Sequence, residues 1–155
     1  MRMRFVPSAV FLVASLCTAF AANVGAQTPP PKKEAELVAT YKRLNGQEMR
    51  TLIVGNTGYM LFLATTGTIN KGTLVTMYWR DDARTRVGVG NDKKKVESIW
   101  WIEGDLMCGE QKNSDRKGNF CNTIYGLDSA YYICAHPAGN CDVLMRMAPG
   151  NPDKL

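Results

Sequence analysis

The chain has 155 residues, a formal net charge of +5 and 21% charged residues. A chain of this length forms one domain with a modest core. Binding to nucleic acid requires lysine and arginine gathered on one face, and the densest group, Lys93–Lys95, follows Asn91 and Asp92 in an expected hairpin turn. Polyanion binding there is the alternative to a solvated turn. The composition predicts no nucleic-acid partner.

Residues 1–26 have the layout of a secretory signal peptide. Arg2 and Arg4 precede an apolar run over 5–22, and small residues then lead to the expected cleavage site after residue 26. The alternative is a retained membrane helix, which requires about 20 uninterrupted apolar residues. Loss of the two arginines lowers the net charge from +5 to +3. We expect a bacterial periplasmic or secreted protein without an integral membrane span.

The mature chain is expected to begin with an arm over 27–33 that contains three consecutive prolines. Such a segment favours an extended, polyproline-like conformation. Residues 34–155 then follow as one β-barrel domain, which opens with a short helical pattern over 34–41.

A second helix is better marked, over 46–54. Asn45 stands at the capping position, and Glu48 stands three residues later, which is the spacing of a capping box. Met49, Leu52 and Ile53 form an apolar stripe at helical spacing, and a glycine follows at the position that ends helices. The stripe is interpreted as core packing, with a partner surface as the alternative.

From residue 57 onward the pattern changes to short alternating or apolar runs separated by turn residues. About eight such runs, at spacings of roughly 8–12 residues, predict an all-β fold. We expect an eight-stranded antiparallel, lipocalin-like barrel or a sandwich, with a short N-terminal helix. The expected strands are 59–64, 73–79, 84–89, 96–102, 106–108, 120–125, 130–134 and 142–147.

Four cysteines remain after signal removal, an even number typical of a disulfide framework in a small exported chain. Of the three possible pairings, the spacing favours Cys108–Cys121 and Cys134–Cys141, because each pair brackets a turn-rich loop. No Cys-x-x-Cys occurs, and His136, the only histidine, lies between bridged cysteines. The sequence therefore predicts neither a metal nor a cofactor.

No catalytic motif is present. A histidine-dependent hydrolase would need His136 held by an orienting group, and no glycine-rich nucleotide fingerprint occurs. Glu103 and Asp105 could form a glycosidase pair, but they flank a glycine in an expected turn. Met145 and Met147 could bind Cu(I), although core filling by flexible thioethers explains the same spacing. The chain is predicted to be non-enzymatic.

Aromatic residues are the remaining candidates for function. Trp79, Trp100, Trp101, Tyr131 and Tyr132 fall on expected strands, where neighbouring side chains point to opposite faces. One member of each adjacent pair should point inward and the other outward. The inward set fills the barrel or lines a pocket for a small ligand, and the outward set forms a partner-binding patch. These five are the predicted ligand or partner contacts.

Several turn, cap and cysteine motifs occur in a characteristic order. They are Leu44-x-Gly46-x-Glu48, Gly55-Asn56-Thr57, the run from Trp101 through Gly104-Asp105 to Cys108, then Cys121, and the closing Pro149-Gly150-Asn151-Pro152. In this order the chain resembles a family of small exported bacterial proteins classed as a domain of unknown function. The resemblance spans nearly the whole mature chain. It implies a periplasmic, lipocalin-like β protein and no catalytic residues.

The leading hypothesis is a monomeric, non-enzymatic periplasmic binding or interaction module for a small apolar ligand or an envelope protein. The alternative is a proteinaceous inhibitor of a periplasmic or secreted hydrolase. In that case the contact would come from an exposed loop or from the arm over 27–33.

Overall fold

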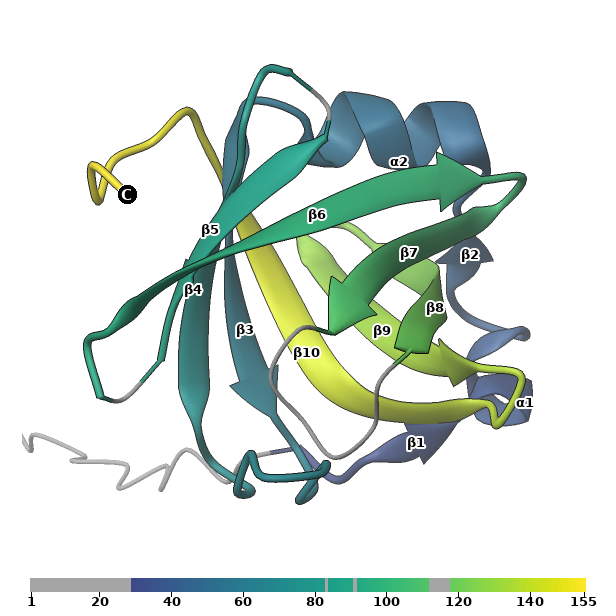
Figure 1. Ribbon diagram of the computed structural model, residues 1–155. Coiled ribbons are helices and arrows are strands. Elements are labelled where there is room, and N and C mark those ends of the chain that lie inside the picture. Colours follow the sequence, from purple (N-terminus) through teal and green to yellow (C-terminus); the bar gives the residue numbers. More distant parts are fainter. Residues whose placement is uncertain (1–28, 83, 91, 112–117) are drawn as a thin grey trace, which may run out of the picture.

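The protein is seen here as a computed structural model that describes residues 29–82, 84–90, 92–111 and 118–155. The predicted signal peptide, 1–26, lies outside the described residues. Eight antiparallel strands form a closed barrel (Figure 1). Their bounds are β3 Asn56–Phe62, β4 Leu74–Trp79, β5 Thr85–Val89, β6 Lys95–Glu103, β7 Leu106–Gln111, β8 Gly118–Leu127, β9 Ala130–His136 and β10 Asn140–Pro149.

The barrel is an up-and-down meander. Each strand pairs with the next along the chain, and β10 pairs with β3 to close the sheet. Closure leaves none of the eight strands as an open edge, which protects the sheet from edge-to-edge association. The predicted eight-stranded antiparallel barrel is confirmed.

Two short strands extend the sheet outside this ring. β1 (Lys32–Lys33) pairs with the start of β10, and β2 (Lys42–Arg43) pairs with β8. The last two residues of the predicted N-terminal arm are therefore part of the fold.

The second predicted helix is confirmed as α2 (Gly46–Ile53). The side chain of Asn45 accepts a hydrogen bond from the Glu48 N–H at 2.9 Å, and the Glu48 carboxylate accepts one from the Asn45 N–H at 3.0 Å. Gly55 ends the helical segment with a φ of +70°, a conformation that glycine adopts without a steric penalty. α2 lies across one end of the barrel (Figure 1). Met49 and Ile53 are fully buried there.

The first helix, α1 (Glu34–Leu37), is shorter than the predicted 34–41. Leu37 is fully buried, and the Tyr41 N–H donates to its carbonyl at 2.7 Å as the chain turns toward β2. Pairing of β2 with β8 begins at residue 42, so the tertiary contact ends a helix that the local pattern would extend.

Side chains fill much of the barrel interior, as in other small eight-stranded barrels. Alternation along the strands turns two tryptophans and several methionines inward. The buried members of this core are Met49, Ile53, Met60, Trp79, Trp100, Met107, Ile124, Ile133 and Met145. A second, outer cluster packs between α1 and the outside of β8, β9 and β10, and comprises Leu37, Leu63, Tyr125, Tyr132, Cys134 and Cys141.

Both predicted disulfides are confirmed. Cys108–Cys121 joins the neighbouring strands β7 and β8, and Cys134–Cys141 joins β9 and β10. Each spans a hairpin connection, as its sequence spacing indicated.

The C-terminal segment after β10 folds back along the outside of β3. Thr57 Oγ1 donates to the Gly150 carbonyl at 2.7 Å, and the Tyr59 hydroxyl donates to Asp153 at 2.7 Å. Neither interaction extends the sheet, whose last strand ends at Pro149, paired with Asn56.

Candidate functional site

Two of the predicted contact residues, Trp79 and Trp100, belong to the barrel core. Their side chains are 0% and 1% exposed. Trp100 Nε1 donates to the Thr85 carbonyl at 3.3 Å. As expected from strand alternation, Trp101 is on the opposite face, half-buried, in register with Cys108. Trp101 is therefore the most accessible of the three tryptophans.

Tyr131 and Tyr132 also point to opposite faces. Tyr132 lies in the outer cluster, where its ring meets that of Tyr41 edge-on at 5.3 Å and the ammonium of Lys32 lies 5.8 Å from its centroid. Burial is the main cause that raises the pKa of Tyr132. The structure thus places Tyr132 beneath α1 and β1. Half-buried Tyr131 points to the opposite face of β9 and lines a surface pocket.

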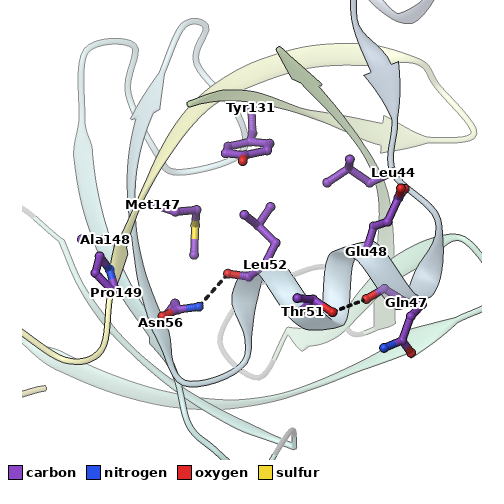
Figure 2. A pocket seen from close by; sticks show the side chains of 10 residues that line it. All are labelled: Leu44, Gln47, Glu48, Thr51, Leu52, Asn56, Tyr131, Met147, Ala148 and Pro149. Atoms are coloured by element: carbon purple, nitrogen blue, oxygen red, sulfur yellow. Dashed lines mark hydrogen bonds between the residues drawn. The ribbon is translucent and has the colours of Figure 1, made fainter. Parts of the chain in front are cut away.

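This pocket, called the end pocket below, opens between α2 and the adjoining parts of β9 and β10 (Figure 2). Its volume is about 570 Å³. Apolar side chains dominate the wall, and Leu52, Tyr131 and Met147 converge on it in Figure 2. The lining residues are Leu44, Gln47, Glu48, Thr51, Leu52, Asn56, Tyr131, Met147, Ala148 and Pro149.

Most polar groups of the end pocket have structural partners. Thr51 Oγ1 donates to the Gln47 carbonyl at 3.0 Å, and Asn56 Nδ2 donates to the Leu52 carbonyl at 3.0 Å. The Glu48 carboxylate caps α2 and also pairs with Lys42. The hydrogen bond from Lys42 is the largest cause that lowers the pKa of Glu48. The pocket therefore presents apolar surface and few unpaired polar atoms.

A second pocket, called the side pocket below, lies beside β6 and has a volume of about 470 Å³. Arg50, Arg84 and Trp101 contribute to it, with Asp82, Ile99, Trp100 and Ile102. The Asp82 carboxylate accepts from the backbone N–H groups of Arg84 and Thr85, each at 2.8 Å, and from the Thr85 hydroxyl. The Thr85 hydroxyl is the largest cause that lowers the pKa of Asp82 from 3.8 to about 2.

The described residues show no assembled catalytic group around His136. Its side chain is exposed at the end of β9 and has no hydrogen bond or ion pair within the described part of the chain. Glu103 comes together with the sulfur atoms of Cys108 and Cys121. Those two atoms form a disulfide, so they do not provide thiolate ligands for a metal.

Comparison of the chain with protein-family models, with curated proteins and with solved structures yields no match. Among the described residues, no helix is both long and apolar enough to span a membrane. The two disulfides are compatible with a location outside the cytoplasm, where such bonds persist.

Of the five predicted contact residues, only Tyr131 lines the end pocket, and Trp100 and Trp101 line the side pocket. Sequence reasoning missed Leu44, Leu52 and Met147. Leu52 was predicted as part of the apolar stripe of the helix. Only part of this stripe packs into the end of the barrel. Met49 and Ile53 are buried, whereas Leu52 remains half-exposed.

Proposed function

We propose that the protein is a non-enzymatic binding module, exported to the periplasm or the medium, that holds a small apolar ligand in the end pocket. The observation that carries the proposal is the apolar wall formed by Leu44, Leu52, Tyr131 and Met147 around a volume of about 570 Å³. Small-molecule sites have volumes of about 300–1,000 Å³, with mostly apolar walls and few polar groups.

The polar and charged groups of the end pocket restrict the kind of ligand that it can bind. Two hydroxyls line the end pocket: that of Thr51 donates to the Gln47 carbonyl, whereas that of Tyr131 has no hydrogen-bond partner among the described residues. Glu48 is ionised and already paired, so a second anion would be repelled. An uncharged, mostly apolar molecule with one hydrogen-bonding group is the best fit. The proposed site lies at one end of the barrel, beside α2, rather than in a central, lipocalin-like cavity.

The test uses the uncharged apolar fluorophore 1-N-phenylnaphthylamine and a filled pocket. Thr51 is exposed at the pocket wall, so Thr51→Trp fills part of the volume without altering the core. We expect saturable fluorescence enhancement with the wild type and at least a tenfold weaker affinity with Thr51→Trp. Thr51→Ala, which removes one weak bond to the Gln47 carbonyl, is the matched control and should bind as the wild type does.

Equal binding by Thr51→Trp and Thr51→Ala would locate the fluorophore elsewhere and contradict the proposal. Urea denaturation of both variants checks that the barrel remains folded. Tyr131→Phe then reports on the hydroxyl: competitors that carry an oxygen should lose affinity, and hydrocarbons should not.

The alternative function, a hydrolase inhibitor that uses the N-terminal arm, requires a revised deletion. Residues 32–33 pair with β10, and the Lys33 side chain hydrogen-bonds to Asn140. Removal of 27–33 would therefore disturb the fold as well as the arm. Deletion of 27–31 leaves β1 intact, so loss of a captured hydrolase after that deletion would favour the inhibitor.

A further inference from the structure

Arg86 is a positively charged side chain inside the barrel. It is in register with Trp79 on β4 and Ser98 on β6, and its side chain lies on the interior face between them. Only 7% of the residue is exposed. Arg84, which precedes the strand, is exposed.

The charge of Arg86 has no counter-ion among the described residues. The ion pairs found there, Lys42–Glu48 and Arg80–Glu97, lie at the surface. Buried charges are normally paired, because removal from water is strongly unfavourable. Burial lowers the pKa of Arg86 from 12.5 to about 10, so the guanidinium is still charged at neutral pH. Among the residues that the structure describes, the charge of Arg86 is therefore uncompensated.

Described residues hold the guanidinium of Arg86 on one edge and one face. Nε donates to Ser98 Oγ at 2.8 Å, and the Phe120 ring covers a face, with 5.4 Å between Cζ and the ring centroid. Gly109 leaves the room for this placement, since a Cβ there would lie 2.8 Å from Nη2. Within the described residues, the two Nη groups have no acceptor.

A second donor without an acceptor lies on the neighbouring strand. Trp79 Nε1 is the one fully buried side-chain polar atom without a hydrogen-bond partner in the described part of the chain. Trp79 and Arg86 are cross-strand partners with both side chains directed inward. Buried donors rarely lack an acceptor in native proteins. Trp79 Nε1 therefore points to an acceptor that the described residues do not supply, at the position paired across the strands with Arg86.

We propose that the interior beside Arg86 binds the carboxylate of a small organic acid. The free Nη edge of a guanidinium matches the two oxygens of a carboxylate in a bidentate geometry. The aromatic surroundings, Phe120 and Trp79, suit an apolar group attached to that carboxylate. The site differs in position and in charge preference from the end pocket, so either can fail without the other.

The primary test is an NMR titration of the wild-type protein, which requires no variant to fold. The signals of Arg86 Nε–H and Trp79 Nε1–H are followed in ¹H–¹⁵N spectra as sodium acetate or sodium benzoate is added. Each addition replaces an equal amount of sodium chloride, so that the ionic strength stays constant. We expect saturable shifts of both signals, with benzoate binding more tightly than acetate. Absence of a saturable shift, or equal shifts with inorganic phosphate or sulfate, would overturn the assignment of a carboxylate site.

Variants of Arg86 test the role of its two Nη groups as a pair of donors. Arg86→Lys keeps the charge but loses the planar pair of donors, so benzoate should bind on the order of tenfold more weakly. Arg86→Met should show no response at Trp79 Nε1–H. It should also be at least as stable as the wild type without carboxylate, because an unpaired buried charge is removed. Arg84→Met is the matched control for net charge and should respond as the wild type does. A benzoate response that survives Arg86→Met would refute the proposal.

Discussion

Replacement of Gly58 by alanine tests how tightly the barrel interior is filled. A Cβ at this position of β3 would lie 2.7 Å from Trp79 Cζ3 and 3.0 Å from Met145 Sδ. Both of those side chains are fully buried, so neither moves aside without displacing its own neighbours. The added methyl group therefore overpacks the core.

The magnitude follows from two opposing effects. Overpacking a well-filled core costs about 1–3 kcal/mol. Replacement of glycine by alanine also restricts the unfolded chain, which stabilises by about 0.4–1 kcal/mol. Gly90→Ala isolates the second effect, because a Cβ there meets only Asp92 Oδ1 at 3.7 Å. We expect Gly58→Ala to be less stable than Gly90→Ala by about 1–3 kcal/mol.

Urea denaturation, with the midpoint and slope of each variant compared, measures this difference. Trp79→Phe removes the ring atoms that meet the new methyl group. The double variant should therefore be more stable than the sum of the single effects indicates, with a coupling of about 0.5–3 kcal/mol.

Equal stability of Gly58→Ala and Gly90→Ala would refute the reasoning. That result would mean that the Trp79 ring has space to shift away from Gly58. The experiment thus measures how tightly the core is packed on the Gly58 side of Trp79, without any ligand in hand.

Three further predictions concern the framework. Because the pKa of Asp82 is lowered to about 2, its stabilising contribution is complete above the unfolded pKa near 4 and is lost as pH falls toward 2. Asp82→Asn should therefore reduce the pH dependence of the urea midpoint between about pH 4 and 2, and should not change it at higher pH. Asn45→Ala removes the cap on Glu48 N–H and should cost about 1 kcal/mol, whereas Asn45→Ser should retain most of the stability in the same assay. Replacement of both Cys108 and Cys121 by serine should lower the free energy of unfolding by about 3 kcal/mol, and an unchanged urea midpoint would contradict a stabilising role for this disulfide.

Local chemistry was sufficient for much of the fold. The capping box at Asn45 and Glu48 defined α2 to within a residue, since it depends only on neighbours in the chain. The turn-rich loops between cysteines indicated both pairings for the same reason. Strand ends were less well defined: β3 begins at Asn56 rather than residue 59, because its first residues pair with the end of β10.

Pairing between strands distant in the sequence determines the features that the sequence pattern did not predict. Arg86 alternates with Val87 along β5, and composition would place the valine inside. Register with Trp79 instead turns Arg86 inward, whereas Val87 is buried on the outer face. The end pocket was missed for a similar reason, because Leu52 and Tyr131 come together only when β9 closes beside α2.

Both disulfides lie in the half of the barrel formed by β7, β8, β9 and β10. Covalent bonds hold β7 to β8 and β9 to β10, whereas β3, β4, β5 and β6 are joined by hydrogen bonds alone. The ring closes between β3 and β10, and Thr57 meets Gly150 there across 93 positions of the chain. Contacts between such distant residues carry the largest loop-closure entropy and form slowly. In the oxidised protein we therefore expect the two disulfide-bonded C-terminal hairpins to form before β3 pairs with β10.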